Sequence, residues 1–204
     1  MGQGPGQKAL ARALIALALA LASPLASAQI NPLSIIGRAV TTAMDVRTKQ
    51  EVADDAEIAA AGSKRLLEDK RAEWAGVTLL VFARHVVIAG AVKSAETRKV
   101  VEALVREDKR ILSLQNDLLV GDVGSLVKDT ALEAEINAKL TGTSGVASVN
   151  MRWSAVGGRV VVMGVARSPQ EAGLAVSRIR DVSGVKSVRS HLRVMPPKKN
   201  SETK

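Results

Sequence analysis

Residues 160–194 read VVVMGVARSPQEAGLAVSRIRDVSGVKSVRSHLRV, and this stretch decides the fold of the chain. Its apolar, β-branched opening predicts a strand that ends at Gly164. In Ser168-Pro169-Gln170-Glu171, Ser stands at an N-cap, Pro at the first helical position and Glu at the third, which predicts a capping box. Beyond the helix, Ser183-Gly184 leads into a last apolar segment. The stretch therefore predicts a strand, a helix and another strand.

The same pattern occurs 74 residues earlier in the chain. In each copy an aspartate also precedes a stripe of residues at helical spacing, which predicts an N-cap followed by one buried helix face. The matched positions include Asp55 with Asp129, Ile58 with Leu132, Leu66 with Leu140, Val77 with Met151, Leu79 with Trp153, Gly90 with Gly164, Ser94 with Ser168 and Val120 with Val194. Each copy therefore predicts helix, strand, strand, helix, strand, and an α+β fold of two tandem modules.

The segments around the two copies have their own signals. We expect the first module at residues 54–122, the second at 127–195 and a disordered basic tail at 196–204. Residues 29–53 form a leader with an apolar stripe at helical spacing, which packs on the first module or touches a membrane. Residues 1–28 have a basic start, an uninterrupted apolar run and an A-x-A site at Ala26 and Ala28, as in a secretory signal peptide. The run is too short to span a bilayer, so we expect no transmembrane segment after cleavage.

Composition narrows the partners of the exported chain. Without Lys8 and Arg12 it keeps 27 basic and 20 acidic residues, a net charge of +7. An exported protein rarely meets nucleic acid, so an anionic phospholipid or an envelope polymer is the expected partner. The absence of cysteine excludes disulfides, thiol catalysis and a lipidated cysteine. The expected location is the periplasm, free or peripheral at the outer membrane.

The second copy resembles the BON module, through the strand that ends at Gly164, the capped helix and the Ser183-Gly184-Val185 step. Two such modules after a signal peptide resemble the dual-BON proteins of the Gram-negative envelope, and Met44-Asp45-Val46-Arg47-Thr48 resembles the segment before their first module. The resemblance implies that each αββαβ module is a three-stranded mixed sheet packed on two helices. It also implies roles in outer-membrane integrity, stress response and phospholipid association.

The first copy diverges from this pattern at its glycines. The second copy has Gly157-Gly158 at its hairpin turn, whereas the first has Arg84-His85 there, with Arg84 at the position of Gly158. Arg110 likewise replaces the structural Gly184. Because a tight hairpin turn needs positive φ, we expect the first turn to be longer or strained. The second module is the expected binding module, and the first its scaffold.

The resemblance places lipid contact at the first helix of the second module. The residues there are Lys128, Ala131, Leu132 and Lys139, without an aromatic side chain, and Glu133 and Glu135 are expected to repel anionic headgroups. Basic residues near the last strand, Lys186, Arg189 and Arg193, form either a patch for anionic lipid or a solubilising surface. These seven positions are the candidate lipid or partner site.

No pattern of catalytic or metal-ligating residues accompanies these features. His85 and His191 are the only histidines and lack spaced partners, and the aspartates stand at expected caps. We therefore expect no enzyme activity, metal or cofactor. The sequence favours a non-enzymatic periplasmic protein that associates with anionic phospholipid and supports outer-membrane integrity. The alternative is a soluble stress or assembly protein that acts through protein partners or as a weak chaperone.

Overall fold

The computed structural model describes residues 44–71, 76–122 and 128–195, and all of them belong to one contact unit, Pro32–Lys204. The predicted signal peptide, leader residues 29–43, Trp74 and the predicted tail lie outside the described residues. Among the residues that are described, no helix is both long and apolar enough to cross a membrane.

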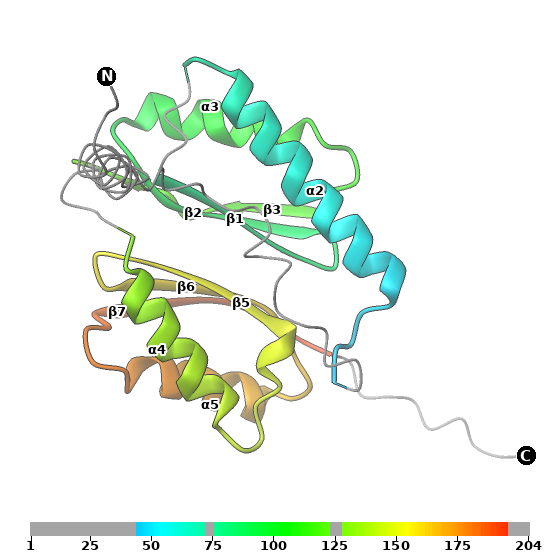
Figure 1. Ribbon diagram of the computed structural model, residues 1–204, viewed down its shortest axis with the longest axis vertical. Helices are drawn as coiled ribbons and strands as arrows, with labels where there is room; N and C mark the ends of the chain where they lie inside the picture. Colours follow the sequence, from blue (N-terminus) through cyan, green and yellow to red (C-terminus); the bar gives the residue numbers. More distant parts are fainter. Residues whose placement is uncertain (1–43, 72–75, 123–127, 196–204) are drawn as a thin grey trace, which may run out of the picture. The chain divides into compact units, whose positions relative to one another are not determined.

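Each module has the predicted element order (Figure 1). The first contains α2 (Lys49–Glu68), β1 (Val77–Phe82), β2 (His85–Val92), α3 (Ala95–Arg106), β3 (Ser113–Asn116) and β4 (Leu119–Val120). The second contains α4 (Thr130–Thr141), the 3₁₀ helix η3 (Ser148–Asn150), β5 (Met151–Val156), β6 (Arg159–Ala166), α5 (Pro169–Arg180) and β7 (Ser187–Val194). The α+β prediction of two αββαβ modules is confirmed.

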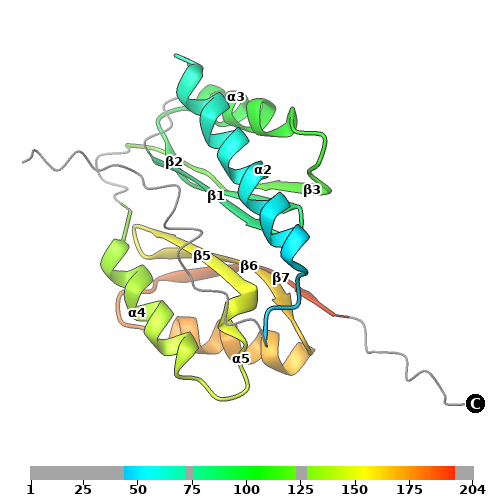
Figure 2. The same cartoon turned by 45° about the vertical axis from the view of Figure 1, so that its right-hand side comes forward.

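Both sheets are mixed, because an antiparallel hairpin is followed by a helix that returns the chain to a parallel strand. β1 pairs antiparallel with β2 and β5 with β6, while β3 and β4 pair parallel with β2 and β7 with β6. The registers repeat at the same interval as the sequence, since Val77 faces Gly90 and Met151 faces Gly164. Within each module the two helices cover one face of the sheet (Figure 2).

The third strand of the first module departs from the expected three-stranded sheet. It is interrupted at Asp117 and Leu118, so that the sheet contains the two short strands β3 and β4 where the second module has the continuous β7. Leu118 is buried in the helix-side core, and Asp117 donates its backbone N–H to the carbonyl of Ile88. The break therefore interrupts the strand without removing it from the sheet, since β3 and β4 pair with β2 in one continuous register.

Three apolar clusters hold the described part of the chain together. One lies between the helices and sheet of each module and includes Ile58 and Val101 in the first, and Ile136 and Ile179 in the second. The third joins the opposite faces of the two sheets, and we call it the intersheet cluster. Its buried members are Leu80, Phe82, Val87, Ala89, Met163 and Val165. Each sheet is thus buried on both faces, which accounts for apolar runs in its strands rather than a strict alternation.

The predicted N-cap at Asp55 is wrong. α2 begins at Lys49, where Thr48 and Glu51 form a reciprocal capping box. Asp55 instead lies within α2, buried, and its carboxylate accepts from the turn N–H groups of Ala83 and Arg84, both at 2.7 Å. The aspartate of the repeat is therefore a residue that holds the hairpin turn.

Asp129 confirms this role in the second module. It occupies the N-cap position of α4 but makes no side-chain cap hydrogen bond. Its Oδ2 accepts from the N–H of Gly158, in the turn of its own module, at 2.6 Å. Asp55 and Asp129 are equivalent positions in the repeat, so both copies use the same contact between the first helix and the hairpin.

The two hairpin turns have the same length, which corrects the expected longer turn in the first module. Ala83 and Arg84 connect Phe82 to His85 at φ +50° and +63°, and Gly157 and Gly158 adopt +58° and +79°. Positive φ at both central positions costs a non-glycine residue about 1–2 kcal/mol. The expected strain is therefore present, at Ala83–Arg84 rather than at Arg84–His85, and the two hydrogen bonds to Asp55 offset it.

The positions of Gly90 and Gly164 require glycine for the same structural reason in both modules. Their φ values are +116° and +128°, and a Cβ there would lie 1.9 Å from the Gly76 carbonyl oxygen and 2.1 Å from that of Asn150. Only glycine allows this approach between paired strands. This geometry is the one expected of glycines with a structural role.

The capping box predicted at Ser168 forms only in part. The Ser168 hydroxyl accepts from the backbone N–H of Glu171, so the N-cap is confirmed. The Glu171 carboxylate turns inward instead, where it accepts from the N–H groups of Ala147 and Arg167 and pairs with the Arg167 guanidinium. A buried carboxylate with these donors connects α5 to the loop before η3.

Candidate functional site

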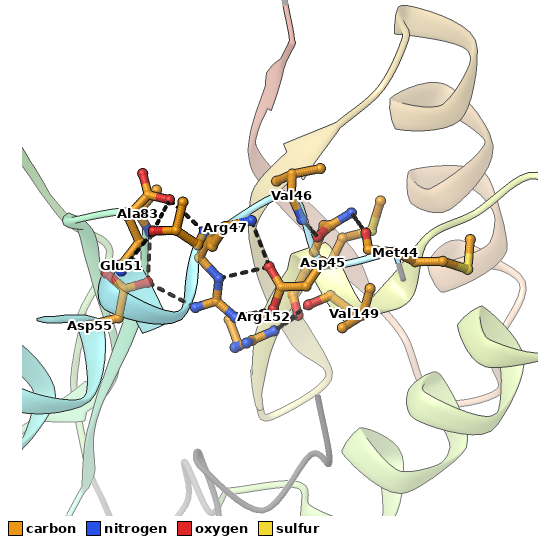
Figure 3. A network of polar contacts seen from close by, with 12 residues as sticks. Met44, Asp45, Val46, Arg47, Glu51, Asp55, Ala83, Val149 and Arg152 are labelled. Atoms are coloured by element: carbon orange, nitrogen blue, oxygen red, sulfur yellow. Dashed lines mark hydrogen bonds and ion pairs between the residues drawn. The ribbon is translucent and has the colours of Figure 1, made fainter. Parts of the chain in front are cut away.

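The segment Met44–Arg47 joins the two modules (Figure 3). The N–H of Val46 donates to the side-chain oxygen of Asn150, whose amide nitrogen donates to the carbonyl of Met44. Because Asn150 is fully buried, its side-chain amide would destabilise the fold without hydrogen-bond partners, and these two bonds supply them. We call this segment the strap, because it is hydrogen-bonded to the second module just before the first module begins.

Arg47 is the central residue of the strap. Its guanidinium forms ion pairs with Asp45 at 2.7 Å and Asp55 at 2.8 Å, and it lies over the Phe82 ring at 4.2 Å. Burial acts to raise the pKa of Asp45, but the hydrogen bonds from Arg47 outweigh it and the pKa lies below the ordinary value. The Asp55 contact extends to the strained turn, so the strap supports the hairpin of the first module.

A second polar contact crosses between the sheets at Asp117. Its carboxylate accepts from Arg189 at 3.1 Å and lies 2.6 Å from Nε2 of His191. Asp117 and His191 stand at the same position of the two copies. The break in the third strand of the first module therefore presents a carboxylate to β7.

Four of the seven predicted site residues come together at one end of the second module. Lys128 forms an isolated bridge with Val156 beside the hairpin, and Ala131 and Leu132 follow in the first turn of α4. Leu132 packs near Gly184, and the stem of Lys186 lies against Gly158. The Lys186 N–H also donates to the Gly158 carbonyl at 2.7 Å. We call Lys128, Ala131, Leu132 and Lys186 the turn-end surface.

Gly158 and Gly184 give this surface its form. A Cβ on Gly158 would lie 2.6 Å from the Gly184 carbonyl oxygen, and both glycines have positive φ. In the first module Arg84 and Arg110 occupy these positions, and the Arg84 guanidinium donates to the Arg110 carbonyl at 2.7 Å. The corresponding end of the first module is thus closed by arginine side chains, and its charge pattern differs.

Glu133 does not oppose the lysines in the way the sequence suggested. Its carboxylate accepts from the N–H of Ala155 at 2.9 Å and lies 3.7 Å from the Lys128 ammonium. Its carbonyl accepts from the Trp153 indole. Glu133 is therefore a structural carboxylate that connects α4 to β5, and of the two glutamates only Glu135 is exposed.

The other three predicted residues lie elsewhere. Lys139 is in the last turn of α4, at the opposite end of that helix. Arg189 and Arg193 project from the face of β7 that looks toward the first module, where Arg189 contacts Asp117. Burial, assisted by the charge of Arg193, lowers the pKa of His85 in the first module. The basic residues of β7 therefore belong to the junction between the sheets rather than to one patch with Lys186.

Within the described ranges, no group of three or more His, Asp and Glu side chains could hold a metal ion. Sequence reasoning missed Arg47, Asp117 and Asn150 as functional parts of the junction. The sequence contains the Met44–Thr48 motif, but its partner Asn150 lies 104 residues from Val46, and no local pattern indicates that contact.

Comparison with known protein families gives a match to the second module. Residues 128–196 match the BON domain family, and this match does not extend to the first module. A protein of Anaplasma centrale named "Uncharacterized protein in gshII 5'region" is 29% identical over 145 residues, which cover 69% of this chain and 95% of that protein.

Two solved structures also align with the chain. Both are of CdsD, described as a structural protein of the type III secretion system of Chlamydia trachomatis. One covers 70% of this chain and 65% of its own at 16% identity, with a TM-score of 0.31. The other is the C-terminal domain, which covers 70% and 67% at 15% identity, with a TM-score of 0.28.

Proposed function

Because residues 128–196 belong to the BON domain family, we propose that this chain is an exported envelope protein that associates with anionic phospholipid through the turn-end surface. In this role it supports outer-membrane integrity from the periplasmic side. BON-domain proteins are generally non-enzymatic, and the proposal includes no catalytic step.

The observation that carries the proposal is the convergence of two lysines and two apolar residues at one end of the second module. Lys128 and Lys186 are exposed beside the same hairpin, and Ala131 and Leu132 lie next to them in the first turn of α4. Each such lysine contributes about 1 kcal/mol near an anionic leaflet. Since Glu133 is held by Ala155 and Lys128, it adds little repulsion at this point.

The test is sedimentation of the exported protein with vesicles of phosphatidylglycerol and phosphatidylethanolamine, beside vesicles of phosphatidylcholine alone. We expect pelleting with the anionic vesicles only, and a decline as salt screens the attraction. Equal pelleting with both compositions, or none with either, would contradict the proposal. Absence of vesicle binding together with recovery of a defined envelope protein would support the alternative that the chain acts through protein partners.

A charge-matched pair of variants separates a surface from general attraction. Lys128→Glu with Lys186→Glu should reduce pelleting at least fivefold, which corresponds to about 1 kcal/mol. Lys99→Glu with Lys139→Glu makes the same charge change on exposed helix positions away from the turn. If both pairs reduce binding equally, net charge alone explains the association and the turn-end surface has no special role.

A further inference from the structure

A cavity of about 510 Å³ lies between the two sheets, at the end where the hairpin of the second module faces Gly90 and the broken strand of the first. We call it the intermodule cavity. Its volume is within the range of small-molecule sites. Its walls combine apolar side chains, including Val156 and Val161, with three arginines.

The cavity exists because the repeat is unequal at two positions. Leu80 and Phe82 belong to the intersheet cluster, and Phe82 also stacks on Arg47 of the strap. The equivalent positions of the second module are Ser154 and Val156, which line the cavity. At one end of the junction an aromatic ring and an arginine fill the space between the sheets. At the other end the side chains at these two positions are smaller, and the space stays open.

Ser154 supplies a polar group that the fold itself does not use. Its side-chain oxygen is buried and has no hydrogen-bond partner in the described part of the chain, and the residue is 2% exposed. A buried hydroxyl without a partner destabilises the fold, so a serine at the position of Leu80 is not explained by packing. Ser154 contributes to the cavity wall, but its oxygen lies beneath that wall, since less than 1 Å² of it is accessible.

The charges around the cavity favour an anion. Arg98, Arg159 and Arg189 line it together with one acid, Asp117. Asp117 already accepts from Arg189 and His191, and Arg98 commits one nitrogen to the carbonyl of Asn116. Arg159 is exposed at the mouth, and no contact of its guanidinium is found within the described ranges. Arginine binds carboxylate and phosphate groups through paired donors.

We propose that the intermodule cavity binds an amphiphile that carries one anionic group on an apolar chain. The carboxylate or phosphate is held by Arg159 and Arg98, and the apolar chain lies along Val156 and Val161. This site is separate from the turn-end surface, because it takes single molecules rather than a membrane face.

Isothermal titration calorimetry of the exported protein tests the proposal with four probes below their micelle concentrations. Dodecyl phosphate or laurate should bind at one molecule per chain, and the tighter of the two identifies the phosphate or the carboxylate as the natural group. Inorganic phosphate and dodecyl maltoside should bind at least tenfold more weakly, since each lacks one half of the recognition. Equal affinity for dodecyl maltoside, or no binding of either anionic amphiphile, would overturn the proposal.

Two variants locate the site. Ser154→Leu with Val156→Phe places the residues of the first module in the cavity and should reduce affinity for the anionic probe at least tenfold. Arg159→Glu should do the same from an exposed position that leaves the cores intact, so the test stands even if the filled variant does not fold. Lys139→Glu is the control and should change affinity less than twofold. Loss of affinity in the control equal to that of Arg159→Glu would overturn the assignment.

The vesicle assay distinguishes this inference from the proposed function. The filled variant should pellet with anionic vesicles like the unchanged protein, because it keeps Lys128, Lys186 and the net charge. Failure of vesicle binding in the unchanged protein would leave the calorimetric result intact, and the reverse holds as well.

Discussion

Replacing Gly164 by alanine tests whether the close approach of β5 and β6 is a requirement of the fold. Gly164 has φ +128°, and an added Cβ would lie 2.1 Å from the Asn150 oxygen and 3.0 Å from the Met151 Cα. Both are backbone atoms at the junction of η3 and β5, so no side chain can rotate to make room. The hairpin must open locally, or the backbone of Gly164 must change its conformation.

The size of the effect follows from these contacts. An alanine held at such a φ costs about 1–3 kcal/mol, and parting the strands weakens ladder hydrogen bonds at about 1 kcal/mol each. We therefore expect Gly164→Ala to lower the free energy of unfolding by more than about 3 kcal/mol, which is large for a single substitution. Gly173→Ala is the matched control, since nothing lies within 4 Å of its Cβ position and it is inside α5. It should stabilise the protein by about 0.5–1 kcal/mol.

Urea unfolding followed by far-ultraviolet circular dichroism measures both variants. The midpoint should fall for Gly164→Ala and rise for Gly173→Ala at an unchanged slope, because the surface exposed on unfolding is the same. Midpoints that move in the same direction by similar amounts would refute the reasoning, since the two changes are chemically identical and differ only in their surroundings.

Three further predictions concern the buried carboxylates. Asp55→Ala should lower the free energy of unfolding by about 3 kcal/mol and Asp129→Ala by about half as much. The reason is that Asp55 accepts from two N–H groups of a strained turn, whereas Asp129 accepts from one N–H group of a glycine turn. Equal losses in urea unfolding would contradict this. Arg47→Ala should lower the free energy of unfolding by about 3–5 kcal/mol in the same measurement, because it leaves Asp45 and Asp55 buried without their counter-charge. A loss below about 1 kcal/mol would contradict the stabilising role given to the strap. The hydrogen bonds from Arg110 lower the pKa of Asp108 from 3.8 to about 2, so its stabilisation is present above 3.8 and is lost as the pH falls toward 2. Asp108→Asn should therefore be less stable than the unchanged protein at pH 6 and approach it near pH 2, and a constant difference would contradict the assignment.

The fold could be predicted because its main signals are local. A strand around Gly164, which continues two residues beyond the predicted end to Ala166, a cap at Ser168 and a glycine before the last strand define one module, and an exact interval transfers the assignment to the first copy. The same local reasoning misplaced Asp55. An aspartate before an apolar stripe is typical of an N-cap, but here Thr48 and Glu51 begin the helix two turns earlier. Only the hairpin, 28 residues away, shows what Asp55 does.

The candidate site was less predictable, because it depends on which face of a strand remains free. Lys128, Ala131 and Leu132 are neighbours in sequence, and Lys186, just before β7, joins them because its N–H donates to the Gly158 carbonyl of the hairpin turn. Arg189 and Arg193 looked like members of the same patch. They alternate with Val188 and Leu192, which face the helices, so they must face the other side of the sheet. That side is directed at the first module, and no pattern within one module reveals this.

The junction explains why the first copy had to diverge. Asp117 and His191 are the same position of the repeat, and they contact each other, as equivalent residues do near a two-fold axis. Two identical copies would place Asp against Asp or His against His at 2.6 Å, and like charges at that distance destabilise the contact. Phe82 and Val156 are also equivalent positions that differ. Phe82 fills the junction beneath Arg47, whereas Val156 leaves the intermodule cavity open. Where equivalent positions meet on such an axis, they can form a complementary pair of unlike groups only when the two copies differ there. The substitutions in the first module are therefore better explained as one half of an interface than as the decay of a binding module.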